Sequence, residues 1–342
     1  MLTSLDKLAY HSQHLSLLIP AIVLDETARL VTRTKRPVID LAVLREIQQR
    51  RVELHRRDLA NVDAGLYPRT MLFDIPMGRY LRALPGLIRD MPNVVRRKRA
   101  NDYKDIPAGL DRERYPAYYR RTFHWQTDGY FSEHSAEVYE VGVELLFRGT
   151  ADVMRRQIIP PISKLVAERG GADRVRVLDV GCGTGRTLHQ LARAHPAMRL
   201  YGVDLSPAYV KIARKRLRDI AELSLAVDNG EALPYADATF DAVTSTYMFH
   251  ELPRNARRNV VREMLRVVKP GGLVVIEDSA QPSESPTLAN VLSGFPVEFH
   301  EPFYMDYLGD DLGAMLAEVG FEDVSTEAHL VAKVVVAKRP LA

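Results

Sequence analysis

The stretch VRVLDVGCGTGRTL, residues 175–188, constrains the fold of this 342-residue chain more than any other segment. An apolar, β-branched run leads into Gly181, Gly183 and Gly185, and residues that favour helices follow. Glycines at this spacing are typical of a tight turn from a strand into a helix, where the backbone can approach a ligand closely.

Two familiar glycine motifs do not fit this turn. A phosphate-binding P-loop needs a lysine followed by serine or threonine, and the turn has no lysine. A dinucleotide-binding turn needs a third glycine where this chain has Arg186, whose side chain opposes close packing of helix on strand. Asp179 stands just before the glycines and favours a ligand with a positive end over a pyrophosphate. A turn without any ligand remains the alternative.

Strand-like and helix-like segments alternate after residue 160. Strands are expected at 175–180, 199–203, 223–227, 240–244, 272–276, 323–330 and 334–338, and helices at 187–194, 207–217, 257–268 and 311–319. This alternation predicts an α/β fold with a mostly parallel sheet and helices on both faces. The last two strands lack a helix between them, so we expect an antiparallel hairpin there.

Helical periodicity dominates before residue 150. Helices are expected at 38–59 and 133–154, and Pro85 and Pro92 predict that 77–99 forms only short helical pieces. We therefore expect a helical N-terminal domain over residues 1–150, which would act as a cap for substrate binding or dimerisation. A ligand-binding domain would follow over residues 151–342.

Polar residues follow the second and third strands of the predicted sheet. Asp204 ends the second strand, nineteen residues after Gly185, where a carboxylate can accept hydrogen bonds from two ribose hydroxyls. Asp228 and Asn229 follow the third strand, where an adenine edge could be recognised. The carboxyl ends of parallel strands meet at one edge of a sheet, so these residues predict a nucleoside-binding crevice there.

These motifs, in this order, resemble the class I S-adenosylmethionine-dependent methyltransferases. The resemblance covers residues 160–342 and is greatest to the ubiquinone/menaquinone C-methyltransferase-like group. It implies a Rossmann-like, seven-stranded sheet of order 3-2-1-4-5-7-6, with S-adenosyl-L-methionine as cofactor. It also implies an enzyme that transfers a methyl group to a small-molecule acceptor by in-line displacement.

The resemblance also implies how the cofactor is held. The glycines would admit its methionine part, Asp179 would orient the turn or the ammonium group, and Asp204 would bind the ribose. Asn229 stands where the family usually has aspartate facing the adenine amine, so the share between Asp228 and Asn229 stays open. The expected cofactor contacts are Asp179, Gly181, Cys182, Gly183, Gly185, Asp204, Leu205, Asp228, Asn229 and Tyr247. No metal ligands are expected.

His250 and Glu251 follow the fourth strand, where catalytic groups of such sheets lie. A histidine near its usual pKa of about 6.5 can accept a proton from a hydroxyl or an activated carbon. Glu251 would orient that ring or bind the acceptor. Alternatively, His250 caps the next helix. An acceptor that is a thioether or a free amine would need no base.

Two further segments offer acceptor contacts. The long connection after the fifth strand contains FHEPFYMDY, with His300, Glu301 and Tyr304, of which Tyr304 is a catalytic candidate. The aromatic segment 115–140 contributes Tyr130 and His134. In both segments the aromatic rings could instead fix a loop or join two domains.

Composition limits the partners. Net charge is only +3 and base-modifying motifs are absent, so no nucleic acid is expected. The single cysteine favours a reducing compartment, and the apolar run 15–24 is too short for a membrane span, so the expected location is cytoplasmic. The basic segment 77–121 could lie on an anionic membrane, and a homodimer is possible. The alternatives are an RNA or protein methyltransferase, or a non-catalytic protein that binds S-adenosylmethionine.

Overall fold

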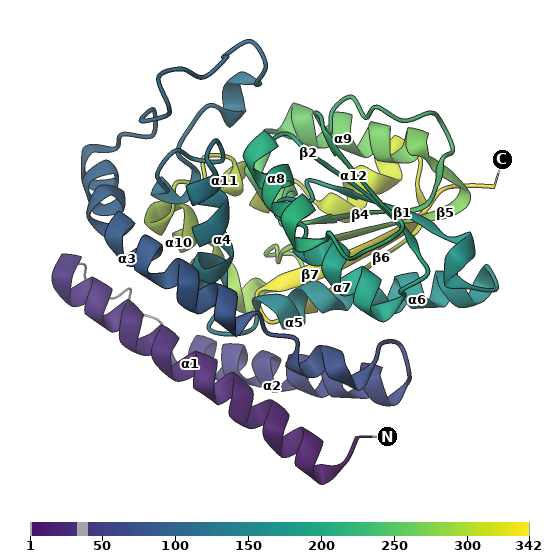
Figure 1. The fold of residues 1–342 in the computed structure, drawn as a ribbon, viewed down its shortest axis with the longest axis horizontal. Coiled ribbons are helices and arrows are strands. Elements are labelled where there is room, and N and C mark those ends of the chain that lie inside the picture. The colour runs from purple at the N-terminus through teal and green to yellow at the C-terminus, as the bar shows by residue number, and fades with distance from the viewer. Residues whose placement is uncertain (1, 33–39, 342) are drawn as a thin grey trace.

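A seven-stranded sheet lies at the centre of the computed structural model, which describes residues 2–32 and 40–341 (Figure 1). The strand order is β3-β2-β1-β4-β5-β7-β6, and only β7 runs antiparallel to its neighbours. The strands are β1 (Arg176–Val180), β2 (Arg199–Asp204), β3 (Leu223–Val227), β4 (Phe240–Thr246), β5 (Val268–Ser279), β6 (Glu322–His329) and β7 (Ala332–Lys338). The predicted fold class, strand order and closing hairpin are confirmed.

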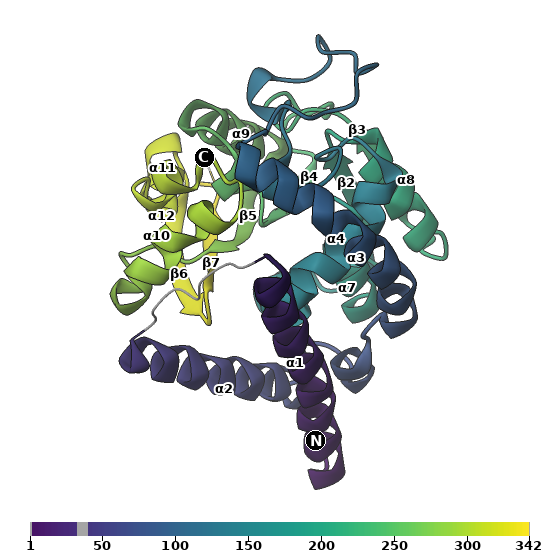
Figure 2. The ribbon, with the colours of Figure 1, turned by 90° about the vertical axis from the view of Figure 1, so that its left-hand side faces the viewer.

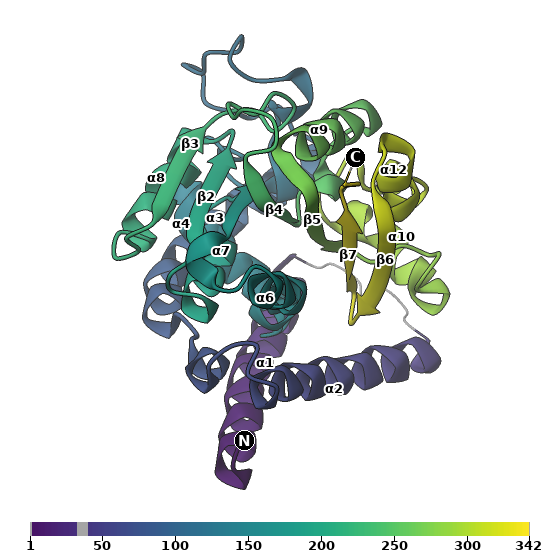
Figure 3. The same cartoon turned by 90° about the vertical axis from the view of Figure 1, so that its right-hand side faces the viewer.

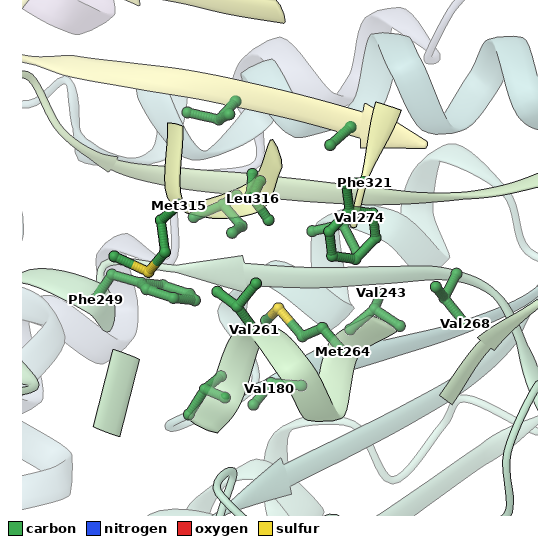
Figure 4. Packing of buried hydrophobic residues seen from close by; sticks show 14 of the residues in the cluster. Val180, Val243, Phe249, Val261, Met264, Val268, Val274, Met315, Leu316 and Phe321 are labelled. Atoms are coloured by element: carbon green, nitrogen blue, oxygen red, sulfur yellow. The ribbon is translucent and has the colours of Figure 1, made fainter. Parts of the chain in front are cut away.

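Helices cover both faces of the sheet because successive strand residues point in opposite directions. Val177 and Val275 pack with the helices of one face, whereas Leu178 and Val274 pack with those of the other. Figure 3 shows the helices on the two faces, and Figure 4 shows Val274 among the side chains of its cluster. The first face carries α6 (Ile159–Glu168), α7 (Arg186–Ala194) and α8 (Pro207–Arg216), and the second carries α9 (Arg254–Val267), α11 (Tyr304–Leu308) and α12 (Leu312–Val319). This core fixes the carboxyl ends of the strands.

The N-terminal helices lie beside and below the sheet (Figures 1 and 2). They are α1 (Ser4–Thr32), α2 (Leu41–Asp63), α3 (Met77–Ala100), α4 (Glu133–Leu146) and α5 (Ala151–Arg155). One more helix, α10 (Ala289–Glu298), lies near the other end of the chain and packs on α11. Helix α4 packs on both α3 and α8, so it joins this region to the sheet. None of the described helices is both long and apolar enough to cross a membrane.

A buried ion pair fastens the first helices to the rest of the chain. Asp58 of α2 accepts hydrogen bonds from Arg156, from Tyr10 at 2.7 Å and from Tyr67 at 2.6 Å. All four side chains are buried, and the Arg156 guanidinium keeps the Asp58 carboxyl ionised despite its burial. Removing one partner of such a pair would leave the other charge buried and unpaired.

Two helix predictions are wrong in detail. Helix α3 is continuous through Pro85 and Pro92, because both prolines lie on its solvent-exposed side, where water can bond the carbonyls they leave unpaired. The helix expected over 133–154 instead ends at Leu146, and α5 starts only at Ala151. Gly149 turns the chain between them with a φ of +81°, close against Leu17 of α1. The start predicted for the 38–59 helix lies outside the described residues, which place its first residue at Leu41.

Candidate active site

The glycine turn follows β1 directly and leads into α7. Gly181 has a φ of +71°, and a Cβ there would lie 2.6 Å from the Met248 sulfur. Gly185 has a φ of +79°, and a Cβ there would lie 2.7 Å from Leu217. Only glycine fits this backbone and these close approaches. The turn therefore leaves exposed backbone beside a cavity rather than side chains.

Asp204 ties β2 to the glycine turn. One carboxylate oxygen accepts a hydrogen bond from the Gly183 N–H and the other from the Ser206 N–H, each at 2.8 Å. Burial raises the pKa of Asp204 to about 6. The carboxylate therefore has a fixed orientation and faces the cavity.

A cavity lies at the carboxyl ends of the parallel strands. It holds about 1090 Å³ of atom-free space, including its mouth. Its lining includes most of the expected cofactor contacts, namely Gly181, Cys182, Gly183, Asp204, Leu205, Asp228, Asn229 and Tyr247. Two expected contacts lie outside this lining: Gly185 is the N-cap of α7, and Asp179 is a residue of β1. Asp179 accepts a hydrogen bond from Thr244 of β4 at 2.8 Å, and burial raises its pKa to about 7.

The two polar residues that follow β3, Asp228 and Asn229, differ in which of their side-chain oxygens already accept hydrogen bonds. One oxygen of Asp228 accepts the Asn229 N–H at 2.8 Å. The Asn229 side-chain oxygen accepts the Glu231 N–H at 3.0 Å, so it already serves the local turn. The second Asp228 oxygen therefore offers the less occupied acceptor on this side of the cavity.

Aromatic rings from the N-terminal half form the opposite wall. Tyr130 stacks on Phe123 with ring centroids 5.3 Å apart, and its edge meets Tyr209 of α8 at 5.4 Å. Tyr119 and Tyr139 also line the cavity. The aromatic density of residues 115–131 marked this segment, but its sequence could not indicate which rings face the cavity. Arg155, from α5, is a further lining residue that the sequence analysis missed.

Four residues from three segments of the chain meet beside this wall, and we call them the histidine–carboxylate cluster: His124, Tyr130, Glu251 and Glu301. The His124 Nε2 lies 3.2 Å from Glu251 Oε1 and 3.0 Å from Glu301 Oε1, and Tyr130 donates a hydrogen bond to Glu251 at 2.5 Å. Burial alone lowers the pKa of His124, but the two carboxylates outweigh burial and raise it to about 10. The ligand atoms of His124 and both glutamates are close enough to share a metal ion.

His250 lies behind the cavity rather than along it. Its Nδ1 hydrogen-bonds Asp278 at 2.6 Å, and the same carboxylate accepts the Phe249 N–H. Burial lowers the pKa of His250, but Asp278 more than compensates and holds it at about 9. A pKa of about 9 favours the protonated ring at neutral pH, and the ring would have to lose that proton before it could act as a base. Its role as a base stays a prediction.

The other acceptor candidates are spread around the site. Glu251 and Tyr130 line the cavity. Tyr304 is buried next to His250 and bonds Ser279 at 2.5 Å. His300 packs on Trp125 and Tyr103, outside the cavity lining.

His134 lies furthest from the role expected for it. Its side chain is exposed on α4 and lies beside Gly86 of α3.

Comparison with known proteins identifies this arrangement. A family profile described as "Methyltransferase domain" matches residues 177–272. The demethylmenaquinone methyltransferase of Renibacterium salmoninarum is 30% identical over 207 residues, which cover 56% of this chain and 81% of that protein. The chain belongs to the class I S-adenosylmethionine-dependent methyltransferases. It is therefore an enzyme that uses S-adenosyl-L-methionine.

Other methyltransferases also match parts of the chain. The 2-methyl-6-phytyl-1,4-hydroquinone methyltransferase of Synechocystis is 37% identical over 117 residues, 33% of this chain and 36% of that protein. Among solved structures, the CurJ carbon methyltransferase has a TM-score of 0.46 at 16% identity and covers 60% of this chain and 63% of its own.

Proposed function

We propose that this methyltransferase acts on a small hydrophobic acceptor with a hydroxylated ring. The observation that carries the proposal is the cavity wall, where Tyr119, Phe123 and Tyr130 line the cavity together with Glu251, whose carboxylate accepts a hydrogen bond from Tyr130. Aromatic rings favour a flat apolar acceptor, and a carboxylate can hold its hydroxyl group. The names of the two relatives above, a quinone and a hydroquinone methyltransferase, support this class of acceptor.

We further propose how the chain holds its cofactor. The open backbone of Gly181 and Gly183 fits the methionine part, the fixed carboxylate of Asp204 fits the ribose hydroxyls, and Asp228 fits the adenine amine. S-adenosylmethionine supplies an electrophilic methyl group on a sulfonium. The chain itself then has to align the acceptor and exclude water, and such alignment can lower a barrier by roughly 7–11 kcal/mol.

Glu251 is our candidate for orienting the acceptor hydroxyl, with His250 and Tyr304 behind it. If His250 assists proton removal, His250→Ala should slow turnover and leave cofactor affinity unchanged. Turnover equal to that of the unmodified enzyme would exclude His250.

Labelled cofactor tests the proposed acceptor class. The protein is incubated with S-adenosylmethionine carrying a labelled methyl group and, separately, with a lipid extract, an aqueous metabolite extract and RNA. We expect labelled product in the organic phase of the lipid extract, identified by mass spectrometry. Label that ribonuclease or protease releases would contradict a small acceptor, and cofactor binding without any product would favour a non-catalytic protein.

The aromatic wall comes from the N-terminal half of the chain, which supports different roles for the two parts of the chain. We propose that residues 1–150 form a cap over a cofactor-binding domain at 151–342.

A cytoplasmic location is part of the proposal, because the only cysteine, Cys182, is buried and free. We also propose peripheral membrane contact through 77–121. A homodimer could form through exposed Leu8, Leu15 and Ile19 of α1, and its mass can be measured by light scattering.

A further inference from the structure

We propose that His124, Glu251 and Glu301 bind one divalent metal ion at the edge of the cofactor cavity. The three come from the turn η3 (Phe123–Trp125), the turn η6 (Phe249–Glu251) and the connection after α10. This goes beyond methyl transfer itself, which the family performs with its sulfonium cofactor. The inferred role of the ion, holding an acceptor oxygen, rests on the proposed function.

The spacing of the donor atoms suits a metal ion. His124 Nε2 is 3.2 Å from one glutamate oxygen and 3.0 Å from the other, and all three donor atoms lie within 4.8 Å of one another. Ligands at right angles around an ion with bonds of about 2.1 Å lie about 3 Å apart. Two of the three spacings therefore match neighbouring ligands of an octahedron, and the ion would replace the proton that His124 otherwise carries, because only a neutral imidazole binds a metal.

Glu301 needs a positive partner that the chain only partly provides. The residue is 2% exposed, and within the described part of the chain its carboxylate makes no regular hydrogen bond, although His124 Nε2 lies 3.0 Å from Oε1. Buried carboxylates without hydrogen bonds are costly. The neighbouring charges are His124, Glu251 and the mutually paired His250 and Asp278, so one imidazole faces two carboxylates. A divalent ion would satisfy both.

The backbone holds His124 in place at an energetic cost. His124 has a φ of +55° and Trp125 a φ of +59°, although neither is glycine. Side-chain residues in this region store strain, and such strain is concentrated at functional sites. The His124 N–H also reaches the His300 carbonyl at 3.4 Å, which joins this turn to the segment that carries Glu301. The fold thus brings the imidazole to the two carboxylates despite unfavourable local geometry.

The donors indicate the class of ion. One imidazole nitrogen and two carboxylate oxygens, without thiolate, suit Mn²⁺, Fe²⁺ or Zn²⁺. Tyr130 donates to Glu251 and would orient that ligand from the second layer of contacts. Because Glu251 also lines the cavity, the open side of the ion would face the acceptor. An ion there would bind an acceptor hydroxyl and favour its ionised form.

Manganese binding tests the site without any methylation assay. The full-length, tag-free protein is stripped with chelator and titrated with MnCl₂, and free Mn²⁺ is followed by electron paramagnetic resonance. We expect one bound Mn²⁺ per chain, and at least tenfold weaker binding in both Glu301→Gln and Glu251→Gln. Glu298→Gln is the matched control, since Glu298 precedes the cluster by three residues and pairs with Lys98 instead. It should bind Mn²⁺ as the unmodified protein does.

Two results would overturn the site: no Mn²⁺ bound by the unmodified protein, or equal binding by it and Glu301→Gln. If Glu301→Gln does not unfold cooperatively, the comparison between unmodified protein and Glu251→Gln decides. Calorimetric titration of S-adenosylmethionine in the same samples separates this question from the proposed function. Bound Mn²⁺ without a methylated product would contradict the acceptor and leave the metal site standing.

Discussion

Asp204 shows how much one side chain can determine at this site. Its carboxylate holds the glycine turn through Gly183 and faces the cavity. We expect Asp204→Ala to weaken S-adenosylmethionine binding at least tenfold, because hydrogen bonds to a charged group contribute about 1.5–3 kcal/mol. Isothermal titration calorimetry measures the change. Asp219→Ala, which removes an exposed carboxylate, should bind as the unmodified enzyme does.

The same residue predicts a pH dependence. Ribose hydroxyls donate to the ionised carboxylate, and burial raises the pKa of Asp204 to about 6. Lowering the pH from 7 to 5 should therefore weaken cofactor binding by about tenfold as the carboxylate is protonated. Asp204→Asn should bind more weakly and show a flatter profile. A variant with the original pH profile would assign the titration to another group, of which Asp179 is the nearest candidate.

Single residues were predictable where the order of the chain encodes their position. Asp204 and Asp228 follow strands whose carboxyl ends meet at one sheet edge, so the strand pattern alone brings them together. His124 meets Glu251 and Glu301 only through the packing of loops that are distant in the sequence. No spacing rule links these three residues, so the histidine–carboxylate cluster could not be predicted.

At the scale of elements, the turn over residues 122–130 is the least predictable part of the site. His124, Trp125 and Asp128 all have positive φ values, and no local pattern signals that. By contrast, the strands and the helices beside them follow from alternating and helical patterns of apolar residues.

Gly129 offers a test of how tightly that turn is built. It has a φ of +54°, and a Cβ there would collide with the Arg121 carbonyl oxygen. We expect Gly129→Ala to lower the free energy of unfolding by more than the roughly 1–2 kcal/mol that left-handed backbone costs alone. Thermal unfolding measures it. The control is Gly109→Ala, because a Cβ at that position meets open space. This variant should change the melting temperature little. Equal melting temperatures in the two variants would contradict a tightly packed turn.

Glu144 of helix α4 should make the stability of the protein depend on pH. Burial, together with the nearby Asp152 charge, raises the pKa of Glu144 to about 8 from an ordinary value of 4.5. Between these pH values the folded protein holds a proton that the unfolded chain releases. The free energy of unfolding should therefore fall as the pH rises from 4.5 to 8.

Glu144→Gln removes this titration. Denaturant unfolding at pH 6 and pH 8 should show a smaller loss of stability at pH 8 in the variant than in the unmodified protein. Glu137→Gln, on the exposed side of the same helix, should leave the pH dependence unchanged. A Glu144→Gln variant with the full original pH dependence would place the responsible proton elsewhere.

At the scale of the whole molecule, the closing hairpin was predictable from the strand pattern and the sheet order only from the resemblance to the methyltransferase family, whereas the placement of α1, α2 and α3 was not predictable. Connection rules limit the topologies open to a parallel sheet, but they do not select one order by themselves. Amphipathic helices can pack in many ways. The buried contact between Asp58 and Arg156 holds α2 in its place, but this contact exists only in the folded protein.

The exposed side of α3 predicts attachment to membranes. Met77, Leu81 and Ile88 are between 39% and 62% exposed, and Arg82 and Arg89 are exposed on an adjacent side of the helix, without ion-pair partners among the described residues. Such a face can bind anionic lipid through apolar burial and charge. We expect the protein to float with vesicles that contain phosphatidylglycerol, and less so at high salt.

The double variant Leu81→Glu, Ile88→Glu should stay in the aqueous fraction of the flotation gradient. Leu341→Glu, which changes a still more exposed residue near the C-terminus, should float as the unmodified protein does. Flotation that is equal in all three proteins would exclude α3 as the contact.

The aromatic wall of the cavity has a consequence for how the protein is made. Its rings at Tyr119, Phe123 and Tyr130 belong to residues that emerge from the ribosome before β1, whereas their packing partner Tyr209 emerges after β2. A nascent chain that stops short of α8 therefore displays these rings with nothing to cover them. Until α8 has emerged, we expect these rings to offer an apolar site that a chaperone can bind.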